Sequence, residues 1–211
     1  MKPVPILPAS TEVLVKVCGL CDADSAIAAT EAGADLLGFH FCDSVRRVSP
    51  DDAATIIQQL PEGPALVGVF IDSPVAEVEE IADFLGLDIV QLHGDERQPF
   101  EVDTMVMKAL KVREGRIPAD ADRWPDPILL DSWSADSRGG TGKAWDWRLA
   151  ESLTVTRKVF IAGGLNPGNV GGVVRRLRPY GVDVSSGVES APRVKDPRLI
   201  EAFVEAAKGG T

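Results

Sequence analysis

The chain of 211 residues contains few cysteines, no long apolar run and no excess of positive charge. Its three cysteines, Cys18, Cys21 and Cys42, are an odd number, which suits a reducing compartment better than a disulfide framework. Cys18 and Cys21 form a C-x-x-C pair, but no second ligand pair follows at zinc-finger spacing, so we expect no metal site. Because no apolar run reaches about 18 residues, we also expect no membrane-spanning helix.

The N-terminal stretch MKPVPILPAS is rich in proline and lacks a long apolar segment, so it does not resemble a signal peptide. We therefore expect a cytoplasmic protein without a membrane partner. The formal net charge of -10 argues against a nucleic-acid partner, which would require a basic surface. It does not exclude a small anionic ligand, because backbone N–H groups can bind a phosphate even in an acidic protein.

Strand-like and helix-like segments alternate along nearly the whole chain. EVLVKVCG precedes DADSAIAATEAG near the start, and VDVSSG precedes KDPRLIEAFVEAAK near the end. We predict eight strands, all but the fifth followed by a helical segment, including a short one in DERQPFEV after the fourth strand. The stretch REGRIPADADRWPD after the fifth strand is predicted to be a loop. Such alternation indicates a parallel sheet.

Eight strand–helix units in about 200 residues, without a change of composition that would mark a linker, predict one α/β domain. The expected architecture is a (β/α)8 TIM barrel with a closed, parallel, eight-stranded sheet. We place this domain at residues 13–209, after an N-terminal tail of residues 1–12. The alternative is an open doubly wound sheet, but no G-x-G-x-x-G motif opens the first helix.

Capping residues predict where several helices begin. Asp22 or Asp24 is expected to cap the first helix, and Ser49, followed by a proline, the second. Asn166, also followed by a proline, is expected to cap the helix after the seventh strand.

Polar residues recur on one face of the predicted strands. Alternate residues of a strand point to opposite faces, so if Val15 and Val17 face the helices, Lys16 and Cys18 face the barrel interior. In a barrel of this class, active sites are built at the carboxyl ends of the strands, so we expect a functional pocket there. By the same rule the other inward-facing residues include Gly38 and His40, Gln91 and His93, Asp131, and Asp183 and Ser185.

Glycine-rich turns follow the last two strands, in IAGGLNPGNV and DVSSGVES. Loops after strands seven and eight form the usual phosphate site of this barrel class, through their backbone N–H groups. A sugar phosphate is therefore the favoured small-molecule ligand.

The chain resembles the phosphoribosylanthranilate isomerase family in a series of motifs that run in order from residue 15 to about residue 200. These motifs are VKVCGL, GFHF…SVRRVSP, VGVF, VQLHGDE, ILLDS…GGTGKAWDW, IAGGLNPGNV and VDVSSGVE. The resemblance implies the barrel fold and an Amadori rearrangement in tryptophan biosynthesis. In that reaction N-(5-phosphoribosyl)anthranilate becomes 1-(2-carboxyphenylamino)-1-deoxyribulose 5-phosphate, without a cofactor or a metal.

The resemblance also implies roles for single residues. Cys18 of the KVCG motif would be the general base, and Asp131 of ILLDS would be the general acid. Substrate-binding positions would be Arg46 at the anthranilate end, Gly164, Ser186 and Gly187 at the phosphate, and His93, Asp183 and Ser185 along the pocket.

Three positions depart from the family pattern. His40 stands where an aliphatic residue is expected, so either the pocket mouth is more polar or the ring simply packs. The loop before SVRRVSP is about one residue short, which leaves both Arg46 and Arg47 as candidates, with the spacing in favour of Arg46. The segment SAPRVKD replaces a usual glycine, so Pro192 and Arg193 bear on how the last loop closes.

Lys16 and Cys18 are expected on the same inward face of one strand, so the lysine charge bears on whether the thiol ionises. A thiol with an ordinary pKa of about 8.5 is only about one-tenth ionised near neutral pH. Lys16 could lower the pKa of Cys18 by about one unit, which would leave the thiol roughly half ionised. Alternatively, Lys16 pairs with an inward carboxylate such as Asp183; the two roles are compatible.

Two other functions remain open on the sequence. A dual-substrate isomerase of the tryptophan and histidine pathways is expected to use two aspartates, which Cys18 disfavours. A barrel that binds a sugar phosphate without turnover is disfavoured by the presence of both Cys18 and Asp131. The oligomeric state and any partner enzyme are not indicated by the sequence.

Overall fold

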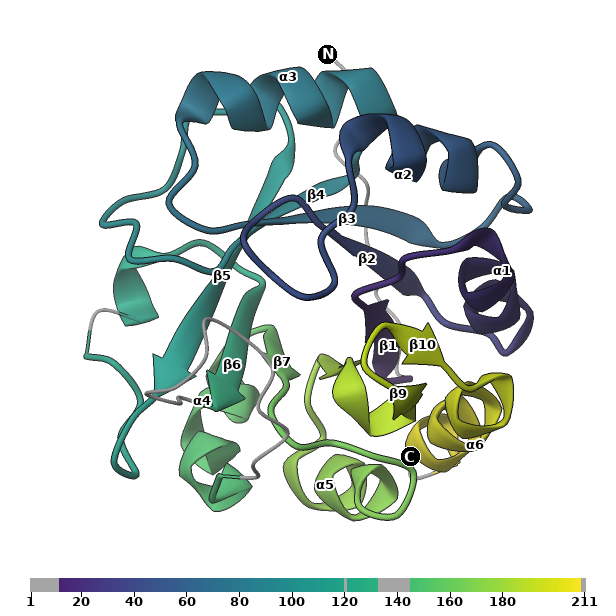
Figure 1. Cartoon of the computed structure of the whole chain (residues 1–211). Coiled ribbons are helices and arrows are strands. Elements are labelled where there is room, and N and C mark those ends of the chain that lie inside the picture. Colours follow the sequence, from purple (N-terminus) through teal and green to yellow (C-terminus); the bar gives the residue numbers. More distant parts are fainter. Residues whose placement is uncertain (1–11, 120, 133–144, 210–211) are drawn as a thin grey trace.

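The computed structural model describes residues 12–119, 121–132 and 145–209 (Figure 1). They form a closed barrel of eight strands in the order β1 to β8, each parallel to its neighbours, with helices around the outside. The predicted α/β barrel is therefore confirmed, and an open sheet is excluded. Most of the predicted N-terminal tail and the glycine-rich segment GGTG after the sixth strand lie outside the described residues.

The barrel strands are short and regularly spaced. They are β1 (Leu14–Cys18), β2 (Leu36–His40), β3 (Ala65–Phe70), β4 (Ile89–Leu92), β5 (Met105–Val112), β6 (Ile128–Ser132), β7 (Val159–Ile161) and β8 (Gly181–Val184). After β8, the two short strands β9 (Glu189–Ala191) and β10 (Val194–Lys195) form an antiparallel hairpin.

The helices lie outside the barrel and join most of its strands (Figure 1). The α-helices are α1 (Ala23–Glu31), α2 (Pro50–Ile57), α3 (Val75–Leu85), α4 (Glu151–Thr156), α5 (Val170–Leu177) and α6 (Pro197–Lys208). Short 3-10 helices are η1 (Ala121–Arg123), η2 (Trp147–Ala150) and η3 (Ser186–Val188). Within the described parts of the chain, no helix is both long enough and apolar enough to cross a membrane.

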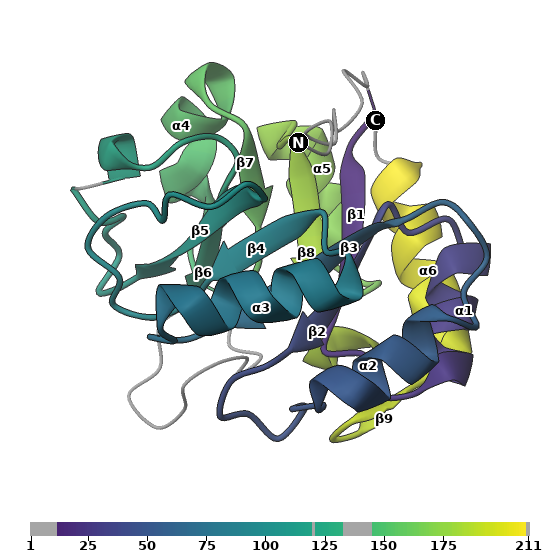
Figure 2. The ribbon, with the colours of Figure 1, turned by 90° about the horizontal axis from the view of Figure 1, so that it is seen from above.

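The first and last units of the chain close the ring. Figure 2 shows α6 lying beside α1, and β8 pairs with β1 in a register that sets Lys16 opposite Asp183. Because every strand runs in the same direction, the carboxyl ends of all eight meet at one end of the barrel.

Two of the predicted helix starts are confirmed and one is wrong. Asp22 caps α1 and accepts a hydrogen bond from the N–H of Ser25, and Ser49 caps α2. Asn166 does not cap α5, which begins at Val170 after Asn169. Asn166 is used in the loop instead, where its N–H donates to Oδ1 of Asn169 at 2.9 Å.

The predicted helix after the fourth strand is absent from residues 93–104. Glu96 explains this conformation, because its carboxylate accepts hydrogen bonds from the backbone N–H of Asp72 and of Gly94 and from Lys108. These bonds tie the segment to neighbouring strands. The predicted loop after β5 is mostly irregular but contains the short helix η1.

The amino-terminal half of the barrel interior is filled by apolar side chains. Its buried members are Leu14, Leu36, Val67, Ile89, Met107, Ala109, Leu129, Phe160 and Ala162. Polar inward-facing side chains are left for the carboxyl-terminal half. The tightest fit is on β7 and β8, where Phe160 lies opposite Gly181 in register.

Substituting Gly181 with alanine tests this packing, because the added Cβ would overlap the Phe160 ring. We expect Gly181→Ala to lower the free energy of unfolding by about 1–3 kcal/mol, measured by urea denaturation. Gly172→Ala in α5 is the matched control, since a Cβ there meets no atom within 4 Å. It should leave stability unchanged or raise it by up to about 1 kcal/mol. Equal stability of the two variants would contradict the packing argument.

Candidate active site

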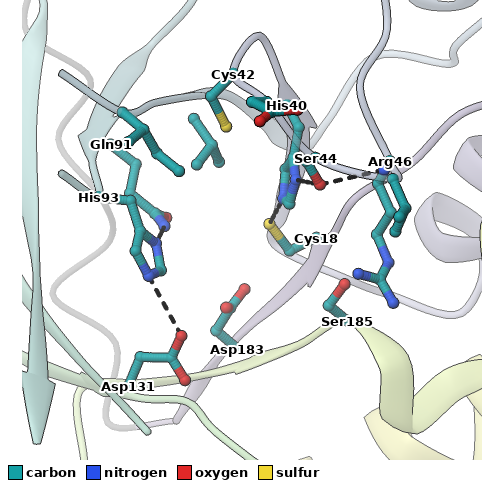
Figure 3. A pocket seen from close by; sticks show the side chains of 14 residues that line it. Cys18, His40, Cys42, Ser44, Arg46, Gln91, His93, Asp131, Asp183 and Ser185 are labelled. Carbon is teal, nitrogen blue, oxygen red and sulfur yellow. Dashed lines mark hydrogen bonds and ion pairs between the residues drawn. The ribbon is translucent and has the colours of Figure 1, made fainter. Parts of the chain in front are cut away.

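A cavity of about 290 Å³ opens at the carboxyl ends of the barrel strands. Figure 3 shows its side chains, which come from several strands and from the loop after β2. The cavity is lined by Cys18, His40, Cys42, Asp43, Ser44, Val45, Arg46, Val69, Ile71, Gln91, His93, Asp131, Asp183 and Ser185.

Most of the side chains predicted for the site meet in this cavity. They are Cys18, Arg46, His93, Asp131, Asp183 and Ser185. The sequence reasoning missed Gln91 as a site residue, although its place two residues before His93 already put it on the inward face. Cys42 also lines the cavity, although it was not among the predicted site residues. Cys42 follows β2, so the alternation of strand residues gave no guide to it.

Cys18 and Asp131 lie on different sides of the cavity. Cys18 ends β1 and Asp131 lies on β6, and Figure 3 shows Asp183 between them. Both side chains are more than nine-tenths buried, so they face the cavity and not bulk water. The two groups can thus approach one bound molecule from two directions.

Lys16 lies beneath Cys18 and is fully buried. Its Nζ lies 2.8 Å from Oδ1 of Asp183 on the neighbouring strand β8. Burial alone disfavours the ammonium, but the Asp183 carboxylate outweighs this penalty and raises the pKa of Lys16. Lys16 therefore has the pairing role that the sequence left open.

The ionisation expected for Cys18 is wrong for this structure. Burial raises the pKa of the thiol, and this effect exceeds the lowering by the nearby Lys16 charge. Asp183 adds to the increase, because it places a negative charge near the sulfur. The spacing of residues in the sequence placed Lys16 near Cys18. It could not show how deeply the thiol is buried, and burial makes the thiolate unfavourable. Cys18 is thus a thiol at neutral pH.

Asp131 is held by groups from β4 and from its own strand. Its Oδ2 lies 3.3 Å from Nε2 of His93, and its Oδ1 accepts the N–H of Ser132 at 2.7 Å. The other ring nitrogen of His93 lies 3.3 Å from Nε2 of Gln91. Because that amide nitrogen only donates, Nδ1 of His93 is the acceptor and Nε2 carries the hydrogen toward Asp131.

The structure distinguishes Arg46 from Arg47. Arg46 is buried and lines the cavity, whereas Arg47 is exposed. The Arg46 guanidinium binds the Glu189 carboxylate through two hydrogen bonds of 2.6 Å, from Nε and from Nη2. Burial acts to raise the pKa of Glu189, but Arg46 and Lys195 together lower it. Glu189 and Lys195 were not predicted as site residues, and only the fold brings them to Arg46.

Arg193 joins the last hairpin to the loop that carries Arg46. Its backbone has a φ of 72°, a left-handed conformation that favours glycine. Its Nη1 donates to the carbonyl oxygen of Val45 at 2.7 Å and to that of Arg47 at 3.2 Å. These two hydrogen bonds close the hairpin against the loop after β2.

The glycine-rich turns after β7 and β8 lie next to each other. A Cβ at Gly187 would overlap the carbonyl oxygen of Leu165, which shows how closely these turns approach. Gly164 has a φ of 77°. Gly164, Ser186 and Gly187 are not among the residues that line the cavity. In the described part of the chain, their backbone N–H groups donate no hydrogen bond, so they remain available to an anion.

The described residues contain no group of three or more His, Cys, Asp or Glu side chains placed to hold a metal ion. The ionisable groups that line the cavity include two thiols, three carboxyl groups and two imidazoles. These are groups that transfer protons.

Comparison with known proteins gives a consistent result. The family model for N-(5'-phosphoribosyl)anthranilate (PRA) isomerase matches residues 15–206. The N-(5'-phosphoribosyl)anthranilate isomerase of Pelobacter propionicus is 44% identical over 200 residues, which cover 93% of this chain and 96% of that protein. The enzyme of the same name from Rubrobacter xylanophilus is 44% identical over 202 residues, or 92% of this chain and 98% of that protein.

Solved structures agree. The phosphoribosyl anthranilate isomerase of Thermotoga maritima matches with a TM-score of 0.83 and 37% identity, over 93% of this chain and 99% of that one. A phosphoribosyl anthranilate isomerase in complex with reduced 1-(o-carboxyphenylamino)-1-deoxyribulose 5-phosphate matches with a TM-score of 0.80, 37% identity and the same coverage. The chain belongs to the N-(5'-phosphoribosyl)anthranilate isomerase family.

Proposed function

We propose that the protein converts N-(5-phosphoribosyl)anthranilate to 1-(2-carboxyphenylamino)-1-deoxyribulose 5-phosphate, a step of tryptophan biosynthesis. The observation that carries the proposal is the placement of Cys18 and Asp131 on different sides of one cavity. This Amadori rearrangement requires one acid and one base that act on different atoms of a bound sugar. Family membership supports the same reaction.

Asp131 is the general acid of the proposed reaction. It gives a proton to the furanose ring oxygen, while the anilino nitrogen supplies electrons and the ring C–O bond breaks. The products of this step are an open-chain Schiff base and the Asp131 carboxylate. The hydrogen bond from the N–H of Ser132 and the nearby His93 ring then stabilise that carboxylate.

Cys18 receives the proton that leaves C2′ of the Schiff base. The electrons of the broken C–H bond form the enolamine, which tautomerises to the ketose. Lys16 beneath the sulfur favours negative charge there. The Amadori product is an isomer of the substrate, so no oxidant or reductant is consumed.

The remaining residues hold the substrate. Arg46 has bound Glu189 through Nε and Nη2, so its Nη1 remains for the anthranilate carboxylate. The Oγ of Ser185 and the Oε1 of Gln91 are buried without a partner in the described structure, and substrate hydroxyl groups would satisfy them. Gly164, Ser186 and Gly187 would bind the phosphate through backbone N–H groups.

Loss of the thiol tests the base. We expect Cys18→Ala to fold normally and to lose about 10²- to 10⁴-fold in kcat, the usual contribution of a positioned base. N-(5-phosphoribosyl)anthranilate is generated in the reaction mixture. Its consumption is measured as a loss of its anthranilate-type fluorescence. Cys21→Ala is the matched control, because Cys21 makes only weak contacts through its sulfur to the carbonyls of Gly19 and Arg46. Wild-type turnover in Cys18→Ala would refute the assigned role.

Replacing the acid by its amide tests Asp131. The side chain of Asp131→Asn keeps nearly the same shape and can still accept from Ser132, but it has no acidic proton to give. We expect kcat to fall by about 10²- to 10⁴-fold, with a much smaller change in KM. Steady-state kinetics separate the two parameters. A rise in KM without loss of kcat would assign Asp131 to binding alone.

A further inference from the structure

The Cys18 thiol cannot serve as a base unless its own proton has somewhere to go. Burial raises the pKa of this thiol above its ordinary value of about 8.5. A thiol with a pKa of 9 is only about 1% thiolate at pH 7. Since a protonated sulfur has no strong lone pair to offer, the structure must be searched for a group that takes this proton.

His40 is that neighbour. Its Nε2 lies 3.3 Å from Sγ of Cys18, within hydrogen-bond distance for sulfur. Its Nδ1 lies 3.0 Å from Oγ of Ser44, which in turn accepts the backbone N–H of Arg46 at 3.1 Å. Figure 3 shows the three side chains in a line from the cavity floor toward the loop after β2. The ring is the side chain that the family pattern did not predict.

Hydrogen-bonding capacity determines the direction of these bonds. Lys16 also reaches the sulfur, but an ammonium can only donate. Within the described residues, the partner of Sγ that can accept the S–H hydrogen is therefore Nε2 of His40. Nδ1 then carries the ring hydrogen and donates it to Oγ of Ser44. The half-buried Ser44 hydroxyl remains free to donate to water at the rim.

The surroundings of His40 keep its ring neutral. Burial lowers the pKa of His40 well below 6.5, and positive charges from several elements add to the effect. Lys16 lies on β1, Arg46 belongs to the loop after β2, and Lys195 lies on β10. The nearby carboxylates of Asp183 and Glu189 are already paired with Lys16 and with Arg46. At neutral pH, Nε2 is thus an unoccupied base beside a protonated thiol.

We propose that His40 accepts the thiol proton of Cys18 in the same step in which Cys18 accepts the C2′ proton. This inference rests on the proposed function. The C2′–H bond breaks and a new S–H bond forms, while the old S–H bond breaks and an Nε2–H bond forms. The cationic Schiff base becomes a neutral enolamine, and neutral His40 becomes an imidazolium, so charge and protons balance.

The relay removes the need for a free thiolate. The sulfur is a thiol before and after the step, and the positive charge moves from the substrate to the ring of His40. Afterwards His40 loses one proton to bulk water, and Asp131 regains the one that it gave to the ring oxygen. His40 is thus a positioning and proton-accepting partner of Cys18.

Two substitutions separate proton transfer from hydrogen bonding. His40→Gln retains a polar side chain that can contact Sγ but cannot hold an extra proton, whereas His40→Val restores the aliphatic residue type of the family. We expect both to lose at least about 30-fold in kcat at pH 7, because even an ordinary thiol is only about 3% thiolate there and the pKa of Cys18 is raised. KM should change little. Wild-type kcat in His40→Gln would overturn the relay.

The pH profile gives a readout that a structural role would not change. In the wild type, the working forms are neutral His40 and thiol Cys18, so kcat should be level between the lowered pKa of His40 and the raised pKa of Cys18. In His40→Gln, activity depends on the thiolate, so kcat should rise about tenfold per pH unit above neutrality. The ratio of wild-type kcat to His40→Gln kcat would therefore fall as the pH rises. A ratio that does not change with pH would overturn the relay.

A measurement without substrate tests the same hydrogen bonds. The chain has two histidines, so two imidazole spin systems appear in a long-range ¹H–¹⁵N NMR spectrum, and His40→Gln assigns them. We expect His40 to be neutral with its hydrogen on Nδ1 at pH 7. A hydrogen on Nε2 would overturn the relay even if a variant failed to fold.

The kinetic measurements include Cys18→Ala, so that failure of the proposed relay can be told apart from failure of the proposed function. An active wild type, an inactive Cys18→Ala and a fully active His40→Gln would overturn the relay and keep the proposed function. An active Cys18→Ala or an inactive wild type would overturn the proposed function, and the relay with it.

Discussion

The buried ammonium of Lys16 is the charge around which the cavity is arranged. It is fully enclosed, and its contact with Asp183 joins β1 to β8 where the barrel closes. A buried charge that loses its partner costs about 3–5 kcal/mol, so these two residues depend on each other. The same charge lowers the pKa of His40 and partly offsets the effect of burial on Cys18. One lysine thus helps to set the protonation state of the groups above it.

Proton-transfer groups occupy two separate parts of the cavity. On one side, the His93 ring contacts both Gln91 and Asp131 and so links β4 to β6. On the other, Cys18 and His40 pair the ends of β1 and β2. Each histidine fixes the hydrogen position of a neighbour that reacts in the proposed mechanism. Because these groups lie on or directly after barrel strands, little conformational freedom has to be removed when a substrate binds.

Binding groups are held differently, by contacts between loops. Arg46 lies in the loop after β2 and is held by Glu189, which also binds Lys195; both partners follow β8. Arg193 adds hydrogen bonds from the hairpin to two carbonyl groups of the same loop. The cavity mouth therefore depends on residues that are far from Arg46 in the sequence. The reacting groups thus lie on the rigid sheet, whereas the group proposed to recognise the substrate at the cavity mouth lies on a loop.

Sequence alone determined the barrel and much of its inner face. Strand residues alternate with a period of two, so the inward position of Lys16, Cys18, His93, Asp131 and Asp183 follows from local covalent geometry. The alternation failed only where segments leave the strands. Glu96 ties residues 93–104 to distant groups and prevents the predicted helix, and Cys42 reaches the cavity from a loop.

Tertiary structure decided the electrostatics and the pairings. Whether the Cys18 thiol ionises depends on how deeply it is buried relative to the strength of the Lys16 charge, and neither quantity is present in a sequence. The sequence marked His40 as unusual, but its contact with Cys18 arises only when β1 and β2 lie side by side. Arg46 and Glu189 are 143 positions apart and meet only in the closed barrel. Local geometry sets which way a side chain points, whereas its charge state and its partner depend on the residues that folding brings around it.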